Sequence, residues 1–163
     1  MRDAWRIGAI AGLCLAASAG IAAALALSVT PPAEPQDGRG WVLEARAHMD
    51  ANRFVEAARA YENGLAASRK VAGDPLVWCE LADALGMAQG GKLEGRPTEL
   101  VHKALAIGPT HPRALEMAGS AAYEAGNYQR AILYWEQLLT QLPPGGGAHA
   151  ELSAAIARTR RMP

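Results

Sequence analysis

The chain has 163 residues, half of them apolar, and its 16 lysines and arginines are balanced by 16 aspartates and glutamates. This length suits one domain with an appendage. Arg2, Asp3 and Arg6 are the charged residues before Thr30, so 14 basic and 15 acidic residues follow it. This balance excludes a basic face large enough to bind nucleic acid.

The first thirty residues form a separate unit, which we interpret as a membrane anchor. No charged residue occurs from Ile7 to Val29, and a helix of that length rises about 34 Å, enough to cross the hydrocarbon of a bilayer. Arg2 and Arg6 precede this single span, which predicts a cytoplasmic N-terminus in a bacterial inner membrane and a periplasmic location for the rest. A cleaved signal peptide is the alternative, because Ala24-Leu25-Ala26 offers a small-x-small cleavage signal.

Residues 31–40 are rich in proline, glycine and charge without periodicity, so we expect a semi-rigid linker. The domain behind it is expected to cover residues 41–161. Its first part is a weak helical hairpin from Trp41 to Leu65, with the turn at Asn52-Arg53. Glu44 stands where an apolar residue is usual, so this hairpin is interpreted as the partly exposed end of the domain.

A second hairpin is predicted from Trp78 to Pro109. Its first helix is indicated by apolar residues at spacings of three and four, namely Trp78, Leu81, Ala82 and Leu85. An enlarged loop, Gln89 to Arg96, joins the two helices. Pro97 then opens the second helix, at a position where proline is tolerated.

The third hairpin, from Arg113 to Pro143, has the clearest pattern. Both of its helices carry one apolar stripe, and Gly126-Asn127 between them supplies the left-handed backbone that ends the first helix. Gly119, Ala131, Trp135 and Pro143 fall where the 34-residue tetratricopeptide repeat has small, small, aromatic and proline residues. Small residues let the paired helices approach closely, and Trp135 fills the gap to the next element.

Ala104 and Pro109 lie one such period before Leu138 and Pro143, so the three hairpins are interpreted as successive repeats. A last helix is expected from Ala148 to Arg161 and covers the open apolar edge of the third repeat. The predicted fold is an all-α tetratricopeptide repeat superhelix of three hairpins with a C-terminal capping helix, behind one N-terminal transmembrane helix.

Enzymatic chemistry is not expected. Cys14 and Cys79 lie on opposite sides of the linker and cannot form a disulfide or redox pair. No phosphate loop, paired-carboxylate arrangement or haem-attachment motif is present, and we predict no cofactor and no metal site. The histidines are scattered without metal-ligand spacing: His48, His102, His111 and His149.

Stacked hairpins form a concave face from the first helix of each repeat, and such faces hold extended peptides or single helices. The predicted groove consists of Arg46, Met49, Asp50, Asp83, Met87, Glu116, Ser120, Tyr123 and Glu124. Its methionines and tyrosine suit the apolar stripe of a helical ligand, and Asp83, Glu116 and Glu124 suit basic residues at its edge. Alternatively, the acidic residues form an ordinary solvated surface. The repeat alignment also places Val42 and Cys79 on or near this face, although we interpret Cys79 as core packing.

The loop Gln-Gly-Gly-x-Leu-x-Gly-Arg-Pro, residues 89–97, is the most specific motif, because generic repeats have a short turn at this position. With residues 78–88, 104–109, 118–123 and 134–139, it resembles the periplasmic domain of c-type cytochrome biogenesis factors of the CcmI/CycH type. The resemblance covers residues 40–158, nearly all of the sequence after the linker.

The resemblance implies an assembly chaperone. Members of the family capture the C-terminal helix of unfolded apocytochrome c and deliver it to the membrane haem-ligation complex, which attaches haem. Two alternatives stay open. One is a maturation factor for a multihaem nitrite reductase, whose repeat domain looks similar. The other is a scaffold that organises a membrane complex without holding a client peptide.

Overall fold

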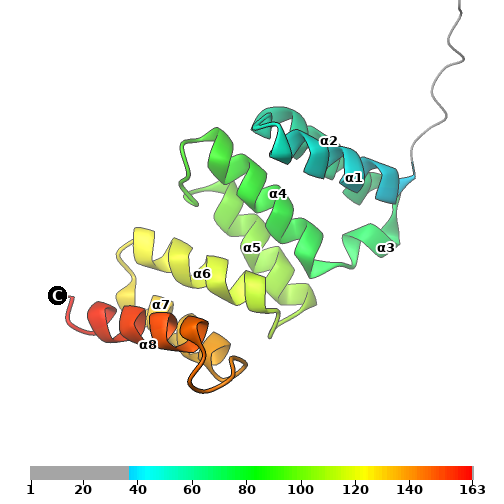
Figure 1. The fold of residues 1–163 in the computed structure, drawn as a ribbon. Coiled ribbons are helices and arrows are strands. Elements are labelled where there is room, and N and C mark those ends of the chain that lie inside the picture. Colours follow the sequence, from blue (N-terminus) through cyan, green and yellow to red (C-terminus); the bar gives the residue numbers. More distant parts are fainter. Residues whose placement is uncertain (1–36, 163) are drawn as a thin grey trace, which may run out of the picture. The chain divides into compact units, whose positions relative to one another are not determined.

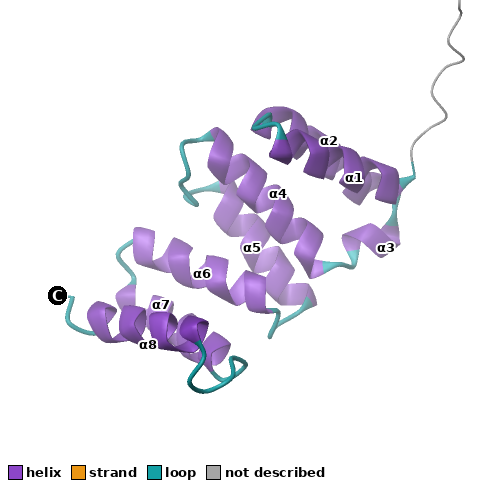
Figure 2. Ribbon diagram, in the orientation of Figure 1, coloured by secondary structure: helices purple, strands orange, loops and turns teal. Residues whose placement is uncertain are grey.

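The computed structural model describes residues 37–162, and this part of the chain contains eight helices and no strand (Figures 1 and 2). The predicted membrane span and most of the predicted linker lie outside the described residues. The helices are α1 (Gly38–Asp50), α2 (Phe54–Ala67), α3 (Arg69–Ala72), α4 (Pro75–Ala88), α5 (Arg96–Ile107), α6 (Pro112–Glu124), α7 (Tyr128–Leu139) and α8 (Gly147–Thr159).

The helices pack as three successive hairpins, α1 with α2, α4 with α5, and α6 with α7. Neighbouring hairpins contact one another through α2 and α4, through α4 and α6, and through α5 and α6. The last helix, α8, packs against α7. The predicted all-α repeat architecture, with three hairpins and a final helix, is therefore confirmed for residues 37–162.

Side-chain caps explain where several helices begin. Asp37 accepts a hydrogen bond from the Gly40 N–H at 2.7 Å, so α1 begins at Gly38, and the last three residues of the predicted linker are helical. The first residue of α1 lies close to α2. A Cβ on Gly64 of α2 would lie only 2.9 Å from the Gly38 carbonyl oxygen, so the glycine at position 64 permits this approach. Asp74 and Asn127 cap α4 and α7 in the same way.

The short helix α3 between the first two hairpins was not predicted, because four residues are too few to show a periodicity. It begins behind Ser68, whose hydroxyl accepts a hydrogen bond from the Val71 N–H. The Trp78 indole N–H donates to the Ala72 carbonyl at 2.8 Å. The Lys103 ammonium lies 4.1 Å from the centre of the Trp78 ring, so Trp78 joins α3 to α4 and α5.

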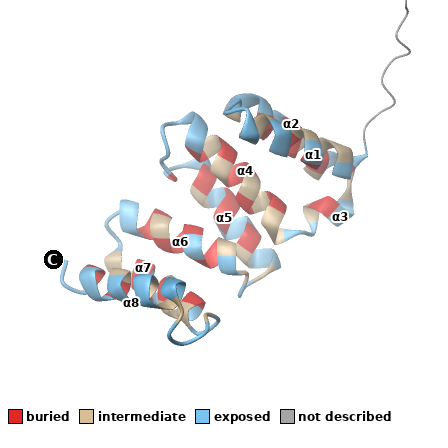
Figure 3. Cartoon of the chain, in the orientation of Figure 1, coloured by how far each residue is buried: buried red, intermediate tan, exposed pale blue. Residues whose placement is uncertain are grey.

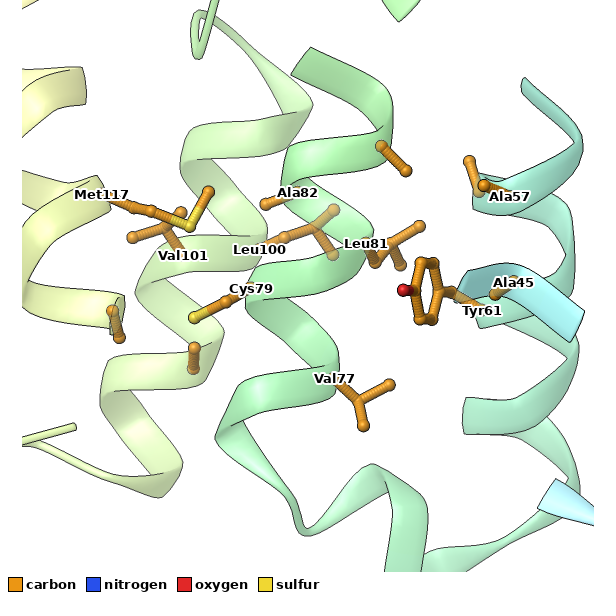
Figure 4. Close-up of a cluster of buried hydrophobic side chains, with 14 of the residues drawn as sticks. Ala45, Ala57, Tyr61, Val77, Cys79, Leu81, Ala82, Leu100, Val101 and Met117 are labelled. Carbon is orange, nitrogen blue, oxygen red and sulfur yellow. The ribbon is translucent and has the colours of Figure 1, made fainter. Parts of the chain in front are cut away.

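The core is built mainly from small side chains, and its buried faces point between the helices (Figure 3). One cluster runs through all three hairpins, where Tyr61 and Leu81 are among the largest fully buried side chains (Figure 4). A second cluster joins Trp135 and Ile132 of α7 to Ile156 of α8. The final helix thus covers the third repeat as predicted.

Cys79 provides a test of core packing. Its side chain is fully buried between the hairpins, and burial, assisted by the charge of Asp83, raises the pKa of the thiol to about 12. Only roughly one thiol in ten thousand is then ionised at pH 8, and the thiolate is the reactive form. In a variant with Cys14→Ser, we expect Cys79 to react with a disulfide reagent only as fast as the protein unfolds. Reaction in native buffer at the rate of an unfolded control would contradict this packing.

Candidate peptide-binding site

The nine predicted groove residues all lie on α1, α4 and α6, the first helices of the hairpins, and none of them is buried. The exposed fractions of Met87 and Tyr123 are 48% and 39%, which is high for such large apolar side chains. Val42 and Cys79 are different. Both are buried in the main core cluster, so the placement of Val42 on the open face was wrong, whereas the interpretation of Cys79 as core packing is confirmed. A Cβ on Gly64 would lie 3.3 Å from the Val42 side chain, so Val42 faces α2, the second helix of its own hairpin.

A hollow of about 330 Å³ brings four of the predicted residues together. Arg46, Met49 and Asp50 of α1 line it with Asp83 of α4, and Tyr61 and Glu80 complete the lining. The Arg46 guanidinium donates two hydrogen bonds to the Glu80 carboxylate, at 3.0 and 3.1 Å. This bidentate pair raises the pKa of Arg46 and fixes α1 against α4.

Tyr61 stays neutral at the bottom of this hollow. Burial and the nearby Glu80 carboxylate raise the pKa of its phenol well above the usual value. The hollow therefore presents one uncharged phenol beside an ion pair, with the flexible Met49 side chain at its edge.

Arg113 joins α6 to α4. Its guanidinium lies 2.6 Å from the Asp83 carboxylate and 2.9 Å from the Glu116 carboxylate. Burial alone would lower the pKa of Arg113, but the hydrogen bonds that its guanidinium donates to these two carboxylates, together with their charge, outweigh it and raise the pKa. Two of the three acidic residues expected to meet a basic ligand are therefore already paired within the chain.

Glu124 lies at the C-terminal end of α6 and has a different neighbour. Its carboxylate accepts a hydrogen bond from the Leu93 N–H of the enlarged loop at 2.9 Å. The loop is further held by the Gln89 amide, which donates to the Lys92 and Glu94 carbonyls at 2.6 and 3.0 Å. Leu93 itself is buried in the core. Glu124 thus holds the loop in place.

Tyr123 is held in place by neighbouring aromatic rings. The centre of its ring lies 5.4 Å from that of Tyr128 and 5.9 Å from that of Trp135. Both separations lie in the range of favourable tilted aromatic pairs. The exposed edge of Tyr123 is therefore presented in a defined orientation, beside the turn between α6 and α7.

Sequence reasoning missed Glu80 and Arg113, the partners of the predicted groove residues. A signal for one of them exists, because Arg46 and Glu80 lie 34 residues apart, one repeat length. Glu62 and Arg96, which pair on α2 and α5, have the same separation. Charges of opposite sign at equivalent positions of successive repeats would have pointed to both pairs.

The described part of the chain, residues 37–162, holds no group of three or more histidine, cysteine or acidic side chains arranged to bind a metal ion. Nor does any helix in this part have the length and apolar character needed to cross a bilayer. The span predicted from Ile7 to Val29 lies outside these residues.

A family model described as the cytochrome c-type biogenesis protein H TPR domain, where TPR denotes the tetratricopeptide repeat, matches residues 22–148. The chain belongs to this family. The resemblance found in the loop motif and the repeats is thereby confirmed. The matched residues include α1 to α7.

Curated relatives agree with the family. The chain is 32% identical over 128 residues to the cytochrome c-type biogenesis protein CycH of Pseudomonas aeruginosa. This alignment covers 78% of the chain and 31% of that relative. It is 30% identical over 109 residues to CycH of Bradyrhizobium diazoefficiens, covering 67% of the chain and 29% of the relative. The chain therefore spans about a third of the length of these biogenesis proteins.

Two further comparisons concern a related system and the fold. The chain is 26% identical over 130 residues to the formate-dependent nitrite reductase complex bifunctional subunit NrfFG of Haemophilus influenzae, covering 79% of the chain and 32% of that subunit. Among solved structures, the first TPR domain of Spaghetti (RPAP3) bound to an HSP90 peptide has a TM-score of 0.62 at 16% identity, covering 78% of the chain and 95% of that domain. The structural similarity establishes the repeat fold alone.

Proposed function

We propose that the chain is a non-enzymatic assembly factor for c-type cytochromes, held in the bacterial inner membrane by its N-terminal span. Its repeat domain lies in the periplasm, binds the C-terminal helix of apocytochrome c along α1, α4 and α6, and presents it to the haem-ligation complex. Membership of the biogenesis family supports this role. The observation that carries the choice of surface is the exposure of Met87 and Tyr123 on helices whose other apolar side chains are mostly buried.

Exposed apolar side chains supply the driving force for binding. Complete burial of a methionine or aromatic side chain contributes about 1.5–3 kcal/mol. Tyr123 is already held by Tyr128 and Trp135, so it loses little conformational freedom when a ligand covers it. Met49 and Met87 are flexible and adapt to different apolar partners. This combination suits one face of an amphipathic helix.

The charge on the same face favours a basic ligand even though several acids are paired. Arg46 and Arg113 are outnumbered there by the carboxylates of Asp50, Glu80, Asp83 and Glu116. The surplus of negative charge attracts lysines and arginines at the edge of a bound helix. Since none of these groups is buried, the effect weakens as salt is added.

The decisive experiment is a calorimetric titration of the detergent-solubilised full chain with synthetic peptides that cover an apocytochrome c from the same cell. We expect binding in the micromolar range for the C-terminal helix alone. The double variant Met87→Ala/Tyr123→Ala is expected to bind about tenfold more weakly, because two apolar contacts are removed. The matched control is Leu133→Ala on α7, whose side chain is 65% exposed and does not belong to α1, α4 or α6.

Three outcomes would contradict the proposal. Equal affinity for all segments of the apocytochrome would remove the C-terminal helix as the ligand. Unchanged affinity in the double variant would show that the peptide does not bind at Met87 and Tyr123. Binding of no peptide by a folded chain would favour the scaffold, which acts without holding a client.

A second candidate is a maturation factor for a multihaem nitrite reductase. The observation that favours it is the similarity to the nitrite reductase complex subunit NrfFG. Peptides from the C-terminus of such a reductase belong in the same titration. Tighter binding to these peptides than to the apocytochrome helix would select this second function.

A further inference from the structure

A second and larger hollow lies between the later helices of the domain and shares α6 with the proposed client surface. Its volume is about 750 Å³, against about 330 Å³ for the hollow between α1 and α4, and the two share no lining residue. It is bounded by α5, α7 and the loop between α4 and α5, with α6 between them. We call it the α5–α7 groove. It stands independently of the function proposed for α1, α4 and α6.

Small side chains form the base of the α5–α7 groove. Ala118, Ala121 and Ala122 of α6 line it together with Ala125, the residue that follows α6, and the ring of Tyr134 on α7 forms an aromatic side. Since alanine ends at Cβ, the base leaves room that a larger residue would fill. A bulky apolar side chain from another molecule would cover these methyl groups and part of the Tyr134 ring.

The enlarged loop forms one wall of the groove, and it is anchored there on both sides of Leu93. The Leu93 N–H donates to Glu124, its carbonyl accepts from the Thr98 hydroxyl, and its side chain is buried. Lys92 and Glu94 flank this anchor, and both line the groove. The loop turns at Gly90, Gly91 and Gly95, which all have φ values between 76° and 85°. The extra residues therefore build a fixed wall.

The charges at the groove leave cations available. Within residues 37–162, neither Lys92 nor Arg130 has an ion-pair partner, and His102 also lines the site. The lining also carries two carboxylates: that of Glu124 accepts the Leu93 N–H, and that of Glu94 makes no ion pair or hydrogen bond in the described structure. A carboxylate entering the groove would be attracted by Lys92 and Arg130.

We propose that the α5–α7 groove is a second binding site, which takes an extended segment of a partner protein carrying a bulky apolar side chain flanked by acidic side chains. The apolar side chain packs on the alanines of α6, and the carboxylates pair with Lys92 and Arg130. The site thus offers two cations without ion-pair partners in the described structure, whereas the surface on α1, α4 and α6 carries a surplus of carboxylates. One chain can engage two different proteins at once.

The probe is the blocked pentapeptide acetyl-Ser-Glu-Leu-Glu-Ser-amide, added to isotope-labelled full chain in detergent micelles and followed by NMR. We expect saturable shifts of the backbone amide signals of Gly95, Ala121 and Arg130 at peptide concentrations up to about 10 mM. Replacing both glutamates by glutamine, or the leucine by alanine, is expected to weaken binding at least fivefold. These two peptides separate the charged and apolar contributions.

Variants of the chain locate the site. Arg130→Ala and Ala125→Trp are each expected to weaken binding at least fivefold, the first by removing a cation and the second by filling the groove. Arg59→Ala is the control, since Arg59 is an exposed arginine on α2 without an ion pair in the described structure. Met87→Ala/Tyr123→Ala should leave the pentapeptide affinity unchanged.

The proposal is overturned if the groove amides do not shift, if shifts map to α1 and α4, or if Arg130→Ala binds as the parent does. A further peptide, with glutamines in place of the glutamates and a free C-terminal carboxylate, tests whether the groove binds a chain terminus. If only that peptide binds, the groove recognises a chain terminus and the proposed internal segment is wrong. Failure of the apocytochrome titration would not produce any of these results.

Discussion

Gly119→Ala is expected to lower the free energy of unfolding by about 2–4 kcal/mol, a large effect for one methyl group. A Cβ on Gly119 would lie less than 3.0 Å from three atoms of the Trp135 indole, including 2.8 Å from Cε2. The ring cannot move away cheaply, because it is buried against α8 and beside Tyr123. Either α6 and α7 separate or the indole leaves its position.

Urea unfolding of the full chain measures this loss. The control is Gly126→Ala, where φ is 74° and a Cβ would meet nothing within 4 Å. That change costs only the left-handed backbone, about 1–2 kcal/mol. A second background, Trp135→Leu, makes room for the new methyl group. Adding Gly119→Ala there is expected to cost less than it does in the parent. An equal cost in both backgrounds would show that the indole is not the cause.

Arg113→Gln is expected to tighten the binding of a basic client helix about tenfold while it lowers the free energy of unfolding by about 1 kcal/mol. The arginine shares Asp83 and Glu116, and its removal frees both carboxylates for the lysines or arginines of the client. The stability loss is modest because Arg113 is 41% exposed and solvent screens the pair. Affinity and stability therefore change in opposite directions.

Calorimetric titration with the apocytochrome C-terminal peptide, at two salt concentrations, measures the first effect and urea unfolding measures the second. Arg160→Gln is the matched control, because Arg160 pairs with Glu136 near α8 and away from α1, α4 and α6. It should lose a similar stability and keep the parent affinity. The gain in affinity should shrink at high salt. A weaker affinity for Arg113→Gln would mean that Arg113 itself contacts the client.

The sequence was sufficient for the hairpins because their apolar residues recur with the helical period. Gly119, Ala131 and Trp135 even indicated which residues are in close contact between α6 and α7, and the structure confirms the approach at Gly119. Which side of each helix is buried was harder to predict. Val42 lies one residue from the highly exposed Leu43, so a rotation of α1 by one position decides which residue is buried.

The pairing of charges could not be predicted from periodicity. Whether Asp83 meets Arg113 or a ligand depends on how far α6 is shifted along α4, and apolar residues tolerate several such shifts. The contact between Glu124 and the loop could not be predicted either. The hydrogen bond from the Leu93 N–H to the Glu124 carboxylate joins residues 31 positions apart, and nothing in the local sequence of either segment indicates it.

The ties between repeats differ from one junction to the next. The first junction is fastened on both sides, by Arg46 with Glu80 and by Glu62 with Arg96. At the second, Arg113 of α6 pairs with Asp83 of α4, Glu124 of α6 accepts from the Leu93 N–H of the loop, and the Gln141 amide, just after α7, donates to the Thr110 carbonyl at 3.0 Å. The larger hollow borders this junction. Contacts on α4, in the loop and after α7 therefore resist bending at the second junction as well, and Gln141 is one of several ties there. The width of the α5–α7 groove is the dimension that such bending changes.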